Sequence, residues 1–202
     1  MLLQIHPKNP DERKIKQVVE CLRKGGIIIY PTDTIYGLGC SIEQPEAINR
    51  ICALKKIQPE KALLSFICAD LSHLSEYTKA IDTPIFRFLK QYLPGAFTFI
   101  LEASKKTPKL LRAKKDTVGI RVPDNEICRT LIRELGHPIL STSLPYDEDD
   151  IPYTDADIMD EKFGSQVDIV VDGGVGGVIA STIINCTKNP PEIIREGLGV
   201  IE

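Results

Sequence analysis

The sequence contains 202 residues, of which 43% are hydrophobic, and its formal net charge is −3 at pH 7. A chain of this composition can bury an ordinary hydrophobic core, so it is not a low-complexity protein. We predict a single domain over residues 1–202. No apolar run approaches the length that crosses a bilayer, and the N-terminal residues MLLQIHPKNP lack the pattern of a signal peptide. We therefore expect a cytoplasmic protein with no membrane partner.

The first half of the chain alternates helix and strand patterns. A capping pattern at Asn9, Pro10 and Glu12 precedes a helix with one apolar face, which Gly25 and Gly26 end. The patterns that follow predict a strand at 27–30, a helix at 45–56, a strand at 63–68, a helix at 84–93 and a strand at 97–101.

The second half predicts a strand at 118–122, a helix whose apolar face runs from Ile127 to Leu135 with Gly136 beyond its end, and strands at 139–143, 167–171 and 181–186. Helices that alternate with strands predict an α/β fold, and the close spacing of the last strands adds antiparallel pairs. We therefore predict a twisted, mixed parallel and antiparallel sheet with helices packed on it.

Cysteine and histidine give little sign of metal or disulfide chemistry. The six cysteines are widely spaced within apolar patterns, which is typical of buried thiols: Cys21, Cys40, Cys52, Cys68, Cys128 and Cys186. Three histidines and the lack of a CxxC motif argue against a zinc site. We predict no protein-bound metal centre.

Polar side chains gather where predicted strands end, which is where α/β sheets bind ligands. These clusters are Thr32–Tyr36, Ser141–Ser143 and Ser181 with Thr182. No Ser-His-Asp order and no HExxH motif accompany them, so no side-chain nucleophile or other catalytic residue is assigned. Four basic residues are candidates to hold phosphate or carboxylate groups: Lys55, Lys61, Arg121 and Arg195. The pattern favours catalysis by positioning of substrates.

Seven segments together resemble the YrdC-like family of threonylcarbamoyl-AMP synthases. In chain order they are GGIIIYPTDTIYGLGC, LKKIQPEKALL, PGAFTFIL, GIRVPDN, ILSTS, STIIN and IIREG. The resemblance implies a YrdC-like (RibB-like) fold with a concave basic cavity. It also implies a nucleotidyltransferase that joins L-threonine, bicarbonate and ATP, with Mg²⁺ accompanying ATP, for modification of tRNA at adenosine 37.

The resemblance also assigns residues by position. It implies that three residues contact the threonine substrate: Thr32, Thr34 and Ser181. It implies that five residues bind the nucleotide: Lys55, Lys61, Ser141, Ser143 and Arg195. Each assignment has a structural alternative. Thr32–Tyr36 could form only a turn, Lys55 could complement a helix dipole, and Arg195 could pair with a neighbouring glutamate.

Two departures distinguish this chain from the synthase pattern. The family pattern is a lysine, any residue and then an arginine, and in this chain the position of that arginine is occupied by Ile57. Isoleucine cannot supply the forked pair of hydrogen-bond donors that arginine offers to a phosphate. Where the family has alanine and asparagine after STS, this chain has Leu144 and Pro145, followed by an acidic run at 147–150. These features resemble the YciO branch of the family, as do the IHP and NP segments near the start.

Three functions are therefore kept open. The first is synthesis of threonylcarbamoyl-AMP. The second is a YciO-like activity that removes threonylcarbamoyl from tRNA without efficient synthesis. The third is a module that binds tRNA or double-stranded RNA without chemistry, to which the basic residues between Lys105 and Lys115 would contribute. A monomer and a homodimer are both compatible with the sequence.

Overall fold

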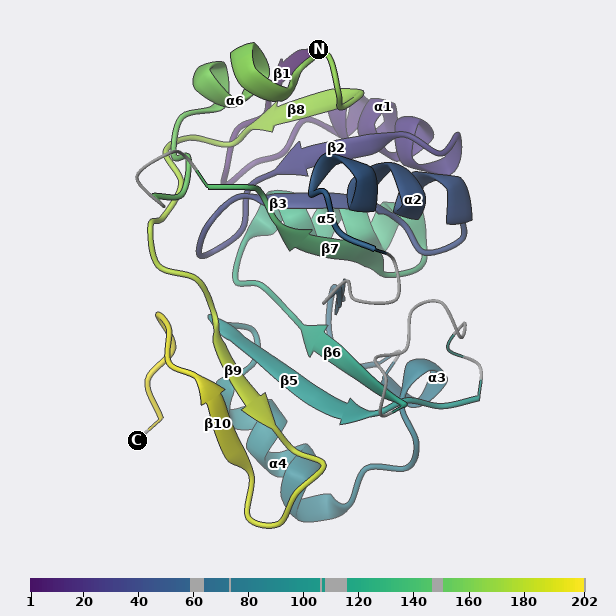
Figure 1. Ribbon diagram of the computed structural model, residues 1–202, viewed down its shortest axis with the longest axis vertical. Helices are drawn as coiled ribbons and strands as arrows, with labels where there is room; N and C mark the ends of the chain where they lie inside the picture. The colour runs from purple at the N-terminus through teal and green to yellow at the C-terminus, as the bar shows by residue number, and fades with distance from the viewer. Residues whose placement is uncertain (59–63, 73, 106, 108–115, 147–150, 202) are drawn as a thin grey trace.

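One mixed sheet organises the residues that the computed structural model describes, which are 1–58, 64–72, 74–105, 107, 116–146 and 151–201. Within these ranges the sheet has ten strands in the order β1-β8-β2-β3-β7-β4-β6-β5-β9-β10 (Figure 1). The strands are β1 Leu2–Gln4, β2 Ile27–Tyr30, β3 Gly37–Ser41, β4 Ser65–Ile67, β5 Phe97–Glu102, β6 Thr117–Arg121, β7 Ile139–Ser143, β8 Ile169–Asp172, β9 Thr182–Asn185 and β10 Glu192–Arg195.

The pairing of these strands confirms the predicted mixed α/β sheet. β8 lies parallel to both β1 and β2, β4 lies parallel to β6, and β5 lies parallel to β9. The pairs β2 with β3, β3 with β7, β4 with β7, β5 with β6 and β9 with β10 are antiparallel. Strands remote in sequence thus become neighbours, which brings the predicted polar clusters onto one sheet.

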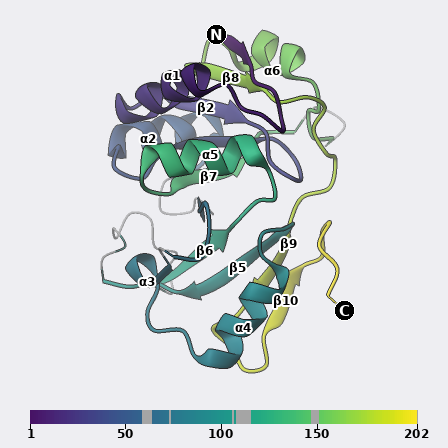
Figure 2. The same ribbon diagram turned by 180° about the vertical axis from the view of Figure 1, so that it is seen from behind.

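Helices cover both faces of the sheet and define two hydrophobic clusters. The helices are α1 Glu12–Arg23, α2 Pro45–Leu54, α3 Leu74–Tyr77, α4 Thr83–Tyr92, α5 Glu126–Leu135 and α6 Ala156–Phe163. α1 and α5 pack side by side on one face of the strands nearest the N-terminus, as Figure 2 shows. Buried residues of α2, α3, α4 and α6 belong to the other cluster, which continues across β5 and β6.

Strand alternation then determines which residues face away from this second cluster. In β6, Val118 and Ile120 lie in the cluster with α4, so Gly119 and Arg121 point to the opposite side. In β5, Phe97 and Phe99 lie in the same cluster, so Thr98 also points to the opposite side. Polar residues of the second half of the sheet therefore share one face.

The helix ends agree with the predictions in part. Gly136 ends α5 in the left-handed conformation (φ 88°), as predicted, and Asn125 caps its start. The predicted cap of α1 is wrong, because the side chain of Asp11, two residues beyond Asn9, accepts from Lys14 N at 3.0 Å. The helix predicted over 45–56 ends earlier, at Leu54, and Lys56 adopts a positive φ of 54°.

Candidate functional site

The segment Thr32–Tyr36 connects the antiparallel strands β2 and β3, and a dense hydrogen-bond network fixes its shape. The Thr32 hydroxyl donates to Ile35 O at 2.7 Å and accepts from Thr34 N at 3.0 Å. The hydroxyls of Thr32 and Thr34 lie 3.2 Å apart. Because the only proton of the Thr32 hydroxyl is used within the loop, Thr32 shapes the loop more than it offers a donor to a ligand.

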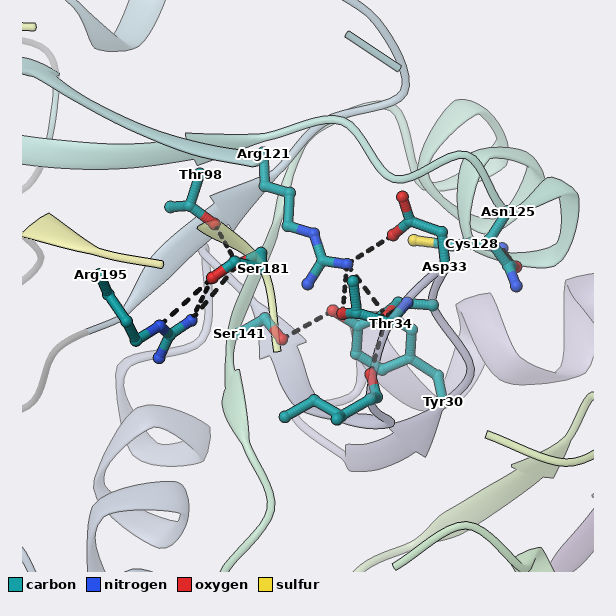
Figure 3. Close-up of polar contacts among 12 residues, drawn as sticks. Tyr30, Asp33, Thr34, Thr98, Arg121, Asn125, Cys128, Ser141, Ser181 and Arg195 are labelled. Carbon is teal, nitrogen blue, oxygen red and sulfur yellow. Dashed lines mark hydrogen bonds and ion pairs between the residues drawn. The ribbon is translucent and has the colours of Figure 1, made fainter. Parts of the chain in front are cut away.

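Arg121, at the end of β6, joins this loop from the other half of the sheet (Figure 3). Its Nη2 donates to Thr34 Oγ1 at 2.7 Å, to Thr32 Oγ1 at 3.1 Å and to Asp33 Oδ1. Only 9% of the Arg121 side chain and 12% of the Asp33 side chain are exposed. The guanidinium is therefore a buried cation, and its carboxylate partner among the described residues is the largely buried Asp33.

Two nitrogens of this guanidinium, Nε and Nη1, have no hydrogen-bond partner among the described residues. Arg121 Nε is buried, and no hydrogen-bond partner for it exists among the residues that the structure describes. A buried polar group normally finds a partner, so an unpartnered arginine nitrogen in a polar cluster calls for an explanation. Nη1 also has no partner among the described residues and, unlike Nε, is not enclosed, so it is the nitrogen that an acceptor on a ligand could reach.

Ser181, just before β9, forms a second polar cluster. Its hydroxyl lies 2.9 Å from Thr98 Oγ1, and both side chains are buried. Arg195 donates to Ser181 O through Nη2 at 2.7 Å and through Nε at 3.2 Å. The alternative pairing of Arg195 with Glu192 or Glu196 is not found among the described residues, and Glu192 instead contacts Lys188. Figure 3 shows Ser181 and Arg121 extending toward the same region, Ser181 from the residue before β9 and Arg121 from the end of β6.

Lys55 lies at the C-cap of α2 and reaches the end of β7. Its Nζ donates to Ser143 O at 2.6 Å and lies 3.4 Å from both Thr142 Oγ1 and Ser143 Oγ. Partial burial lowers the pKa of Lys55 below its ordinary value. A half-buried ammonium held by neutral oxygens is a suitable partner for an anion.

Ser141 lies on β7, opposite Gly39 of β3. Its hydroxyl accepts from Tyr30 Oη at 2.7 Å and donates to Leu38 O at 3.3 Å. In the view of Figure 3, the Ser141 side chain lies below Ser181 and beside Tyr30, to which its dashed line runs. The structure thus brings Ser141 into the neighbourhood of Arg121.

The glycine-rich segment after β8 is attached to the Thr32–Tyr36 loop. Gly177 N donates to Thr34 O at 2.9 Å, and Tyr36 Oη donates to Gly174 O at 2.6 Å. Gly173 N in turn donates to Tyr36 Oη at 3.1 Å. This segment therefore forms a wall beside Thr34.

Some predicted features are placed by the structure and others are not. Lys61, the acidic run at 147–150 and most of the basic residues between Lys105 and Lys115 lie outside the described residues. Of the two departures, Leu144 is buried in the cluster around α2, and Ile57 packs against the same cluster. The side chains at these positions therefore contribute to the core and offer no polar group to a ligand.

Two residues of the site were missed by sequence reasoning. Asp33 pairs with Arg121 and Thr98 contacts Ser181, yet neither was assigned a role. The signal for Asp33 was an acidic residue between two threonines that were both assigned to the site. The signal for Thr98 was a hydroxyl within the apolar strand pattern PGAFTFIL. These residues arrange the side chains that would meet a ligand.

The site is a polar region at strand ends that contains several hydroxyl groups held by hydrogen bonds. Its three basic side chains are Lys55, Arg121 and Arg195. It is suited to hold a carboxylate and phosphate groups in defined positions. Among the described residues no group of three or more metal-ligating side chains is found, and every helix there is too short or too polar to span a bilayer. A mixed α/β fold with an anion-binding site is the class of protein that these features define.

Comparison with known proteins places the chain in a family. Residues 20–197 match the family model Sua5_yciO_yrdC, described as "Telomere recombination", and the chain belongs to this family. It is 42% identical over 199 residues to the "Uncharacterized protein YciO" of Escherichia coli strain K12, covering 98% of this chain and 96% of that protein. A crystal structure of E. coli YciO matches with a TM-score of 0.92 and 40% identity, covering 99% and 97% of the two chains. The prediction of a YrdC-like fold closest to the YciO branch is confirmed.

More distant relatives carry a named activity. The chain is 37% identical over 172 residues to the threonylcarbamoyl-AMP synthase of Idiomarina loihiensis, covering 82% of this chain and 90% of that protein. A crystal structure of "P. abyssi Sua5 complexed with L-threonine" matches with a TM-score of 0.88 and 28% identity. That match covers 98% of this chain but 57% of the longer Sua5 chain.

Proposed function

We propose that the protein binds L-threonine at Arg121 and Thr34 and combines it with bicarbonate and ATP to form threonylcarbamoyl-AMP, with release of pyrophosphate. The observation that carries this proposal is the Arg121 guanidinium, which Nη2 fixes beside Thr34 and whose Nη1 has no partner among the described residues. The carboxylate of an amino acid would accept from this nitrogen in a charge-assisted hydrogen bond. The Sua5 structure that contains L-threonine and the synthase relative support the choice of ligand.

Asp33 explains why the Arg121 cation is tolerated before the ligand arrives. The ion pair and the two threonine contacts occupy Nη2 and hold the guanidinium plane in place. A ligand then meets a cation that is already oriented, which reduces the entropy cost of binding. The second role of Arg121 is thus to orient the amino acid for reaction.

The basic residues at the other strand ends would bind ATP. Lys55 Nζ, which contacts Ser143, and Arg195, which contacts Ser181, are cations that can neutralise the charge on the phosphates. Lys61 and Ser143 are proposed to assist them, as the resemblance implies. Mg²⁺ would enter with ATP and be held mainly by the phosphates, as is common for this ion, and it would offset charge on the departing pyrophosphate.

Calorimetry with Arg121→Lys tests the proposed amino-acid site. This variant keeps a positive charge beside Asp33 but loses the planar fork of donors. We expect the Kd for L-threonine to rise at least ten-fold, about 1.4 kcal/mol in binding free energy. The matched control is Arg50→Lys, because Arg50 forms an exposed ion pair with Asp168 away from this cluster. Equal binding in wild type and Arg121→Lys would overturn the assignment.

Synthesis itself is tested by pyrophosphate release with ATP, L-threonine and isotope-labelled bicarbonate. We expect label in a threonine-dependent nucleotide product, and a large loss of that product in Lys61→Ala and Lys55→Gln. Binding of ATP and L-threonine with no labelled product would reject synthesis while leaving the two ligand sites intact.

A second function is favoured by the two departures from the synthase pattern. Leu144 is buried where the family has a small residue, and Ile57 packs on the core where the family has arginine. We propose as the alternative that the protein binds tRNA and removes threonylcarbamoyl from it, without efficient synthesis. Mass spectrometry of nucleosides from modified tRNA incubated with the protein tests this alternative, and fully intact modification after prolonged incubation rejects it. Binding of unmodified double-stranded RNA at low salt with no change in any nucleoside would favour a binding module.

A further inference from the structure

Tyr30, the last residue of β2, sends its side chain across the neighbouring strand. Tyr30 is fully buried and is paired in register with Gly37 of β3. A Cβ atom added at Gly37 would lie 3.0 Å from the Tyr30 ring, and one added at Gly39 would lie 2.8 Å from it. The ring therefore occupies the space that two side chains of β3 would otherwise fill.

This crossing brings the Tyr30 hydroxyl to the next strand. β7 pairs with β3 on the side away from β2, and Ser141 of β7 lies opposite Gly39. Tyr30 Oη donates to Ser141 Oγ at 2.7 Å. Two glycines within one five-residue strand weaken the strand, and here they allow a tyrosine to reach a serine two strands away.

The contact fixes what Ser141 can offer to a ligand. A serine hydroxyl has one proton and two acceptor positions. The proton points to Leu38 O at 3.3 Å, and one acceptor position receives the Tyr30 proton. The position that is left is an acceptor, so the hydroxyl is set to receive an N–H group.

A purely structural reading explains less of this arrangement. A buried tyrosine hydroxyl needs a hydrogen-bond partner, but any backbone carbonyl satisfies that need. Here the partner is a side chain near Thr34 and Ser181, as Figure 3 shows. The reading as a simple core tyrosine explains the two glycines by the bulk of the ring, but it leaves the choice of Ser141 as the hydroxyl's partner without a reason.

We propose that Tyr30 is a positioning residue, which acts through Ser141 so that the serine accepts a hydrogen bond from the amino group of the bound amino acid. This inference rests on the proposed function, in which the carboxylate of L-threonine binds Arg121. The carboxylate and the amino group would then be recognised by different strands, β6 and β7. Selectivity for an amino acid over a carboxylic acid that lacks the amino group follows from the second contact.

The test compares two ligands that differ in the amino group. L-threonine and 3-hydroxybutyrate both carry a carboxylate and a β-hydroxyl, but only L-threonine has the amino group. We expect Tyr30→Phe, which keeps the ring and removes the hydroxyl, to raise the Kd for L-threonine by about ten-fold. The Kd for 3-hydroxybutyrate should stay within about two-fold of the wild-type value.

A double-mutant cycle separates positioning from general damage to the fold. Ser141→Ala should show the same selective loss, and adding Tyr30→Phe to it should cause no further loss, because Tyr30 acts through Ser141. If Tyr30→Phe does not fold, Ser141→Ala alone still tests the selective loss. Equal losses for both ligands, no loss, or full additivity in the cycle overturn the inference and leave the proposed function standing. Failure of the wild-type protein to bind L-threonine overturns the proposed function, and this inference with it.

Discussion

The contact between Arg121 and Asp33 illustrates what sequence can and cannot reveal about single residues. Basic residues at strand ends, Arg121 among them, were identified from the sequence as candidates to hold anions. The partner Asp33 was not assigned, because the two residues are 88 positions apart and only the strand order brings them together. Residue type and position along a strand are local properties, whereas pairing is a property of the complete sheet.

Breaking this ion pair should be costly. In Asp33→Asn, the Arg121 charge stays buried without a carboxylate, so we expect the free energy of unfolding to fall by about 3 kcal/mol. Urea unfolding followed by circular dichroism measures this change. The double variant Asp33→Asn with Arg121→Met removes both charges and should recover much of the loss. A double variant that is less stable than Asp33→Asn would contradict this account.

Lys55 should give anion binding a distinctive pH dependence. Burial lowers its pKa, so the ammonium loses its proton at a pH below the ordinary lysine value of 10.5. A bound phosphate favours the charged form. The affinity for ATP should therefore decline as the pH rises, and the decline should begin at a lower pH than the one at which an exposed lysine loses its proton. In calorimetry across alkaline pH, Lys55→Gln should bind more weakly and lack this decline, and an identical pH profile in Lys55→Gln would exclude Lys55 from the site.

Among the elements, the longer helices α1, α2, α4 and α5 and the apolar strands were predicted, whereas α3, α6 and the strands β1, β3 and β10 were missed. Apolar periodicity and capping residues locate α1 and α5, whose buried faces match the predicted ones. β3 contains Gly37 and Gly39, and glycine is disfavoured in strands. Its strand conformation comes from pairing with β2 and β7 on both sides, together with the Tyr30 ring that replaces its missing side chains. Local propensity could not reveal such a cause.

The end of α5 offers a clean test of backbone conformation. Gly136 has a φ of +88°, and nothing lies within 4 Å of the position that its Cβ would take. Gly136→Ala should therefore reduce the free energy of unfolding by about 1 kcal/mol through backbone strain alone. Gly136→Asn should cost less, because asparagine tolerates this conformation better. Thermal unfolding of the two variants and the wild type ranks their stabilities. Equal stability of Gly136→Ala and the wild type would contradict this prediction.

At the scale of the whole molecule, two hydrophobic clusters share a single sheet. One contains Cys128 with α1 and α5, and the other contains Cys40, Cys52 and Cys68. That residues 1–202 form a single domain remains a prediction, and it requires the two clusters to unfold together. The buried thiols report on each cluster separately, since burial raises the pKa of Cys40 and of Cys68 to about 12 and also raises that of Cys128.

Labelling of cysteines across a urea series tests this prediction. We expect Cys128 and Cys68 to become reactive at the same urea concentration, because a cooperative unit exposes its core at once. Mass spectrometry of the labelled peptides resolves the two positions. Labelling of Cys128 at a clearly lower urea concentration than Cys68 would show two units that unfold independently.

The strand order also has a consequence for the speed of folding. Leu2 pairs with Val170, Phe97 pairs with Thr182, and Arg121 reaches Thr34 across 87 positions of sequence. A chain dominated by such distant pairings must close long loops before it gains the contacts that reward closure, which slows folding. The helices, stabilised by their own caps, can form early, while the cluster around Arg121 must await the pairing of the central strands. During refolding, recovery of ligand binding should therefore lag behind recovery of helical structure.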